Sequence, residues 1–149
     1  MKVYTIGFTK KTAQEFFGIL DKNSIRKLID VRLNNSSQLA GFTKGKDLKY
    51  FLKVICDIEY EHNLTFAPSK EILERYKKKQ ISWNEYESLF ISLLNERKCI
   101  ETLNLRTNRD YSNICLLCSE FSAINCHRRL VAEYIKEKNP DLGVEIIHL

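Results

Sequence analysis

The sequence predicts an α/β protein with three layers, in which helices cover both faces of a mainly parallel sheet of four to five strands. Strand-like and helical patterns alternate along the chain, which is typical of parallel sheets. The predicted strand at residues 27–32 is apolar on both faces, as a central parallel strand must be. Two capping boxes, at Thr12–Glu15 and Ser82–Glu85, place the starts of two helices.

The first half of the chain contains three predicted strands and two predicted helices. Gly7 ends the first strand, and the capping box at Thr12 opens the first helix. Apolar residues recur at spacings of three and four between residues 47 and 55, which indicates a second helix. The polar segment 33–46 is predicted as a loop whose length is typical of functional loops. The predicted strands in this half are residues 3–7, 27–32 and 58–62.

The second half contains three predicted helices and two predicted strands. A helix begins at Pro68-Ser69 and runs to Lys79, and the aromatic and leucine stripe after Trp83 predicts a second helix that packs into the core. Asn125 is a suitable N-cap for the last helix. This helix is predicted over residues 126–138, and the strands over 114–118 and 144–149.

Composition narrows the class of protein. The 149 residues suit one domain over 1–149, and 44% hydrophobic with 29% charged residues excludes wholesale disorder. No apolar run approaches the ~20 residues of a membrane span, so no membrane partner is expected. Five cysteines without an export signal indicate reduced thiols in the cytoplasm. The net charge of +5, from 24 basic and 19 acidic residues, is compatible with an anionic ligand.

Polar residues gather after two of the predicted strands. Residues two apart at a strand end share a side, and the carboxyl ends of parallel strands meet at one edge of the sheet, where ligands bind. The first turn of the last helix reaches the same edge, and its N–H groups favour an anion. The residues expected together at this edge are Asp30, Arg32, Cys118, Glu120, Cys126, His127 and Arg128.

Three blocks of sequence carry a family resemblance. They are Thr5-Ile6-Gly7, then Asp30-Val31-Arg32 with Ser36, then Leu117-Cys118-Ser119-Glu120 followed by Cys126-His127-Arg128 and Val131-Ala132. In this order, and over nearly the whole chain, they resemble the family called "domain of unknown function 488". The resemblance implies a small α/β domain with a polar site and names no reaction.

The chain departs from the family pattern at three places. Phe8 stands where the family has His, Asn34 or Asn35 where it has Pro, and Ala123 where it has Pro before the Cys-His-Arg block. The missing His removes one candidate acid or base at the first turn.

Four of the edge residues are candidates for catalysis. Cys126 lies at a helix start beside His127 and Arg128, and all three features favour a thiolate. Cys126 is therefore expected to be the most acidic thiol and a nucleophile. Cys115 lies in an apolar strand, where burial is expected to raise its pKa. The alternative for Cys126 is a small packed residue. Cys118 is the other candidate nucleophile, and Glu120 and His127 are candidate acids or bases.

The charged residues have two interpretations. Arg32 and Arg128 are candidate clamps for a phosphate or carboxylate, with Asp30 in the same binding group. Alternatively, Asp30 and Arg32 belong to a structural ion pair with Arg128 or Glu120.

No metal site is expected. Cys115 and Cys118 would need Cys126 and His127 as further ligands for zinc. Two residues three apart on a strand point to opposite faces, so Cys115 is expected in the core. His62, His148, Cys56 and Cys99 are expected to be structural.

Two classes of function remain open, and the sequence leaves any cofactor unknown. The first is an enzyme that binds an anionic or phosphate-bearing small molecule at the carboxyl edge of the sheet. The second is a non-catalytic module for nucleic acid or nucleotide, using the same arginines and two basic clusters. These clusters are Lys44, Lys46, Lys49 and Lys53, and Arg106 with Arg109.

Overall fold

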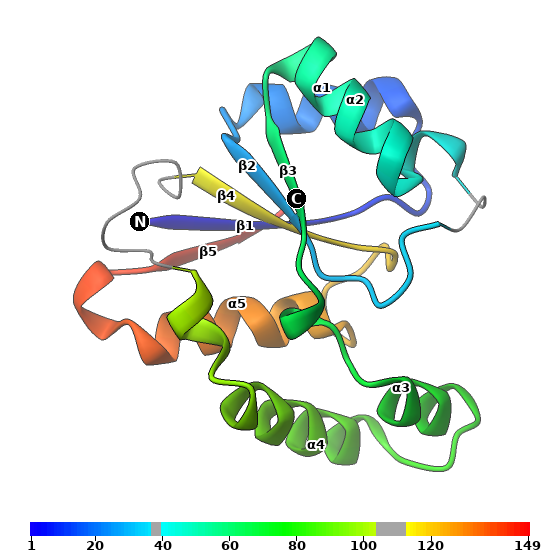
Figure 1. Ribbon diagram of the computed structural model, residues 1–149, viewed down its shortest axis with the longest axis vertical. Helices are drawn as coiled ribbons and strands as arrows, with labels where there is room; N and C mark the ends of the chain where they lie inside the picture. Colours follow the sequence, from blue (N-terminus) through cyan, green and yellow to red (C-terminus); the bar gives the residue numbers. More distant parts are fainter. Residues whose placement is uncertain (37–39, 104–112) are drawn as a thin grey trace.

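The computed structural model describes residues 1–36, 40–103 and 113–149. Within them lies a five-stranded sheet with the order β3-β2-β4-β1-β5, in which every neighbouring pair is parallel (Figure 1). The predicted parallel sheet is confirmed. The strands are β1 (Lys2–Gly7), β2 (Lys27–Asp30), β3 (Glu59–His62), β4 (Asn113–Cys118) and β5 (Glu145–His148).

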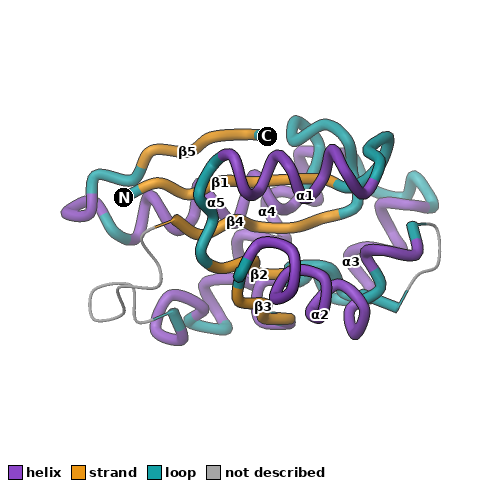
Figure 2. Tube along the Cα trace, turned by 90° about the horizontal axis from the view of Figure 1, so that it is seen from above, coloured by secondary structure: helices purple, strands orange, loops and turns teal. Residues whose placement is uncertain are grey.

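Helices cover both faces of the sheet, which confirms the predicted three layers (Figures 1 and 2). One apolar core lies under α1 and α2, and a second lies under α4 and α5. Helix α3 packs against α4. The helices are α1 (Ala13–Lys22), α2 (Gly45–Cys56), α3 (Lys70–Lys77), α4 (Trp83–Glu96) and α5 (His127–Lys138).

The predicted starts of the helices are largely confirmed. Both capping boxes form. The side chains of Thr12 and Ser82 each accept a hydrogen bond from the backbone N–H of the third helical residue, which is a glutamate in both helices. The side chain of that glutamate accepts a hydrogen bond from the backbone N–H of the cap residue. Ser69 caps α3 in the same way, without the second bond. The prediction of Asn125 as N-cap is wrong, because Cys126 has the extended backbone of the cap residue and α5 begins at His127.

The predicted packing of α4 into the core is largely confirmed. Tyr86, Phe90 and Leu94 are buried in the core on the α5 side, whereas Leu89 is exposed. Trp83 is half-buried and packs against the same core. In the described ranges, every helix is too short or too polar to span a bilayer.

The sheet register brings the predicted site residues to one edge. Strands β2 and β4 are neighbours, with Asp30 opposite Leu117. The segments that follow, which carry Arg32 and Glu120, therefore leave the sheet at the same edge. The prediction that these segments converge is confirmed.

Candidate functional site

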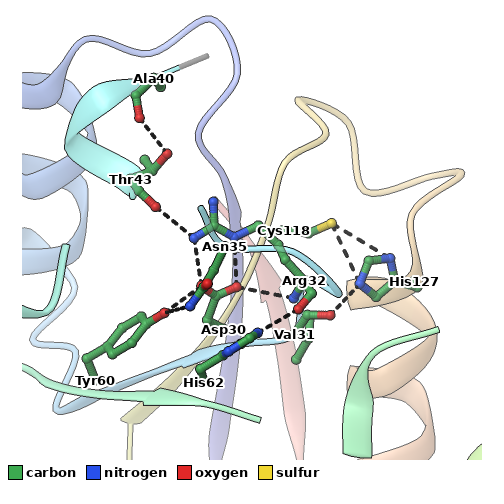
Figure 3. A network of polar contacts seen from close by, with 10 residues as sticks. All are labelled: Asp30, Val31, Arg32, Asn35, Ala40, Thr43, Tyr60, His62, Cys118 and His127. Carbon is green, nitrogen blue, oxygen red and sulfur yellow. Dashed lines mark hydrogen bonds and ion pairs between the residues drawn. The ribbon is translucent and has the colours of Figure 1, made fainter. Parts of the chain in front are cut away.

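A buried ion pair lies at the end of β2 (Figure 3). Arg32 donates to the Asp30 carboxylate through Nε at 2.8 Å and through Nη2 at 2.6 Å, a two-point contact. The Arg32 backbone N–H donates to the same carboxylate at 3.1 Å. Asp30 is completely buried and Arg32 is 3% exposed. The structural ion pair weighed from the sequence is thus present, but the two residues pair with each other instead of with Arg128 or Glu120.

Neighbouring elements hold this pair in place. The Tyr60 hydroxyl on β3 donates to Asp30 Oδ2 at 2.8 Å and accepts from Asn35 Nδ2 at 3.0 Å. Arg32 Nη2 also donates to the Thr43 carbonyl oxygen at 2.8 Å. Burial and the Asp30 charge raise the pKa of Tyr60, so this hydroxyl stays protonated.

One nitrogen of the Arg32 guanidinium has no hydrogen-bond partner in the part of the chain that the structure describes. Nη1 is buried and makes no hydrogen bond within the described ranges 1–36, 40–103 and 113–149, while the guanidinium lies over the Phe8 ring, 5.3 Å from its centroid. Phe8 thus packs against the site at the position where the family pattern has His. A buried N–H donor with no acceptor is costly, so this nitrogen is suited to an anionic ligand.

A thiol and an imidazole meet beside the ion pair (Figure 3). Cys118 Sγ, at the end of β4, lies 3.7 Å from His127 Nδ1 and 3.8 Å from Nε2. His127 Nε2 lies 2.8 Å from the carbonyl oxygen of Val31. A carbonyl only accepts, so Nε2 is the donor in this contact and Nδ1 is left for a second contact.

Cys118 and Cys126 form a second thiol contact. The two sulfurs lie within 4.8 Å of each other. Their interaction lowers the pKa of Cys118, and the same interaction together with burial raises that of Cys126. The backbone N–H groups of Ser119 and Glu120 also favour the Cys118 thiolate. These directions run against the expected order, because the pKa is lowered at Cys118 and raised at Cys126. Burial raises the pKa of Cys115, as expected.

Arg128 holds the loop between β4 and α5. Its two terminal nitrogens donate to the backbone carbonyls of Glu120 and Phe121, and Nη1 also lies 3.5 Å from Cys126 Sγ. The side chain is 1% exposed. Arg128 therefore fixes the positions of the loop and of Cys126, and its predicted role as an anion clamp stays a prediction.

A cleft of about 430 Å³ opens above these groups. This volume is in the range of small-molecule sites. The cleft contains five of the seven predicted site residues: Arg32, Cys118, Glu120, Cys126 and His127. The other two, Asp30 and Arg128, lie behind it and hold the residues that line it.

Three aromatic residues belong to the site although the sequence pattern did not point to them. Tyr76, Trp83 and Tyr86, from α3 and α4, line the cleft. Trp83 and Tyr86 stack, with ring centroids 5.0 Å apart. Their helical spacing predicts a core position, and Tyr86 does occupy one, but nothing in the spacing shows that a cleft also borders the stripe. Tyr60 was also missed. Its position on β3, the strand next to β2, could have indicated that it lies near Asp30.

Other residues behave as structural groups. His62 Nε2 contacts the Arg32 carbonyl oxygen at 2.8 Å, and His148 Nδ1 contacts Thr5 Oγ1 at 2.7 Å. Cys99 and Cys115 are buried. Arg106 and Arg109, one of the two predicted basic clusters, lie outside the described residues.

Fold and site together define a small parallel α/β protein with a thiol and imidazole cleft at the carboxyl edge of its sheet. The family model described as "Domain of unknown function DUF488" matches residues 12–135, which is most of the chain. The protein therefore belongs to this family, and the resemblance found in the sequence is confirmed. Comparisons with curated proteins and with solved structures gave no match.

Proposed function

We propose that this protein is an enzyme that binds an anionic small molecule in the cleft and attacks it with the thiolate of Cys118. The observation that carries the proposal is the convergence of Cys118, His127 and Arg32 on one cleft at the end of two neighbouring strands. Its nucleophile must be a free thiol, so the enzyme acts in a reducing compartment such as the cytoplasm.

The thiol and the imidazole supply the nucleophile and the base. His127 Nδ1, 3.7 Å from Cys118 Sγ, takes the thiol proton, while the Val31 carbonyl holds the other nitrogen as N–H. The thiolate then attacks an electrophilic carbon of the substrate. The new S–C bond forms as the bond to the leaving group breaks, and the imidazolium returns its proton to that leaving group. The interaction with the neighbouring Cys126 lowers the pKa of Cys118 and so favours the thiolate.

The preference for an anion comes from Arg32. Its Nε and Nη2 are engaged by Asp30 and the Thr43 carbonyl, and the buried Nη1 has no acceptor among the described residues, while the Arg32 side chain lines the cleft. Glu120 is exposed at the cleft and is the second candidate acid or base. The aromatic side chains of Tyr76 and Trp83 offer a flat wall for the apolar part of the ligand.

The reactivity of Cys118 tests the proposal. Reduced protein in a metal chelator is treated with iodoacetamide at pH 7, and each cysteine is followed by peptide mapping. We expect Cys118 to react first. The variant His127→Gln keeps a donor for the Val31 carbonyl but removes the base, so it should slow the reaction at Cys118 about tenfold or more.

The control is Cys56→Ser, which removes a half-buried thiol remote from the cleft. It should leave the rate at Cys118 unchanged. If the folded wild-type protein is modified at Cys56 while Cys118 stays unmodified, or if His127→Gln reacts as fast as wild type, the catalytic assignment is wrong.

The second candidate function is a nucleic-acid-binding module. Lys44, Lys46 and Lys49 line another cavity of about 490 Å³ at the start of α2. Lys53 instead pairs with Asp57. Affinity for a single-stranded oligonucleotide that falls steeply with salt, and that is lost when the three lysines are changed to Gln, would favour this module. Binding that is absent, or unaffected by these changes, would exclude it.

A further inference from the structure

We propose that Cys118, Cys126 and His127 bind a soft divalent transition-metal ion such as Zn²⁺, with a fourth position open to the cleft. One donor atom from each of these three residues lies within 4.8 Å of the other two. Two thiolates and one imidazole are a ligand set that zinc prefers, and three protein ligands with an open position are typical of catalytic zinc. This site goes beyond the proposed function and does not depend on it.

The spacing of the donors fits one ion. Zn–S bonds of about 2.3 Å and Zn–N bonds of about 2.05 Å at tetrahedral angles place sulfur and nitrogen about 3.6 Å apart. Cys118 Sγ and His127 Nδ1 are separated by 3.7 Å. Sγ also lies 3.8 Å from Nε2, so the imidazole ring or the Cys118 side chain must turn before Nδ1 and Sγ point at one ion.

The contacts around the cluster prepare its members as ligands. His127 Nε2 bonds the Val31 carbonyl oxygen at 2.8 Å, which orients the ring and leaves Nδ1 for the metal, as is usual for a metal-binding histidine. Arg128 Nη1, 3.5 Å from Cys126 Sγ, supplies a positive charge beside that sulfur. Arg128 itself is anchored to the carbonyls of Glu120 and Phe121.

The site is shielded but open to a ligand. The three residues are 4%, 2% and 9% exposed, and all three line the cleft. Two thiolates balance the charge of a divalent ion, so the loaded cluster adds no net buried charge. An anionic group in the cleft can take the fourth position.

This inference reverses the expectation that no metal is bound. That expectation rested on Cys115, which faces away into the core under α1 and α2. The spacing argument holds for Cys115, but Cys118 and Cys126 come together through the loop that Arg128 fixes, a contact that strand spacing does not reveal.

A bound metal would switch the thiol chemistry off. The ion occupies the lone pairs of Cys118 Sγ and His127 Nδ1 that the proposed nucleophile and base need. Metal-loaded protein should therefore resist alkylation at Cys118 and Cys126, while Cys56 keeps its reactivity.

Cobalt is the probe that tests the site. Chelator-treated, reduced wild-type protein is titrated with Co²⁺ and followed by absorption. We expect one Co²⁺ per chain, a thiolate-to-cobalt charge-transfer band and the visible bands of tetrahedral cobalt, all removed by one equivalent of Zn²⁺. Cys118→Ser and Cys126→Ser should each weaken binding by more than about 100-fold, whereas Cys56→Ser should bind as wild type does.

Two outcomes would overturn the site. One is wild-type protein that gives no thiolate-to-cobalt band, and the other is a Cys56→Ser variant that loses as much affinity as Cys118→Ser. The same test needs no variant if Zn²⁺ is added to wild-type protein, because the bound ion should protect Cys118 and Cys126 from alkylation. Failure of metal binding leaves the proposed thiol reaction intact, because that reaction is measured in chelator.

Discussion

Gly7 is the position where the structure predicts the largest effect of one added methyl group. It ends β1, and the loop after β4 passes directly over it. A Cβ at this position would lie 1.7 Å from the carbonyl oxygen of Glu120 and 3.0 Å from Arg128 Nη1. Gly7→Ala must therefore push the Glu120 carbonyl to at least 3.0 Å, which breaks its hydrogen bond to Arg128.

The expected cost follows from three contributions. Overpacking against backbone costs about 1–3 kcal/mol, and loss of a buried hydrogen bond to a charged donor costs about 1.5–3 kcal/mol. Replacing glycine by alanine in a strand returns about 0.5–1 kcal/mol. The free energy of unfolding should therefore fall by about 1.5–5.5 kcal/mol.

Urea denaturation followed by circular dichroism measures this change. The matched control is Gly18→Ala in the exposed middle of α1, where a Cβ meets nothing within 4 Å. This control should gain about 0.5–1 kcal/mol, because alanine has the higher helix propensity. A Gly7→Ala variant that is as stable as wild type would refute the close approach of the loop to β1.

Two substitutions and one measurement on the unchanged protein have defined outcomes. Ser82→Ala should lower the free energy of unfolding by about 1 kcal/mol in urea, because Ser82 caps α4, and an unchanged value would contradict the cap. Tyr60→Phe removes the hydroxyl that donates to the buried carboxylate of Asp30, so the same assay should show a loss of about 1 kcal/mol or more, and no loss would contradict this contact. In metal-free protein at pH 7, peptide mapping should find Cys118 alkylated before Cys126, because the pKa is lowered at Cys118 and raised at Cys126, and the reverse order would refute that assignment.

The sequence was sufficient to predict the fold and the edge of the sheet that carries the site. Parallel strands have one polarity, so residues after β2 and after β4 must emerge together whatever the details of packing. Arg32, Cys118 and Cys126 were placed correctly for this reason. Capping boxes were predictable because they are local, as the contacts of Thr12 and Ser82 show.

Contacts between side chains distant in sequence could not be predicted in the same way. The pKa shifts of Cys118 and Cys126 have opposite directions because the two thiols interact with each other. This contact is set by the path of the loop between them. Arg128 is near the predicted site, yet its nitrogens are taken up by loop carbonyls that no spacing rule identifies. Helical periodicity placed Trp83 against the core, but it carries no information about the cleft beside it.

The central claim is that Cys118 is a nucleophile in a cleft that selects anions, and two related reagents test it most directly. Iodoacetate carries a carboxylate, whereas iodoacetamide is neutral and of similar size. The rate with iodoacetate divided by the rate with iodoacetamide at Cys118 should be at least about tenfold higher in the folded protein than in the same protein unfolded in urea. Phosphate should lower this ratio in the folded protein. An equal ratio in the folded and unfolded protein, unaffected by phosphate, would contradict the account.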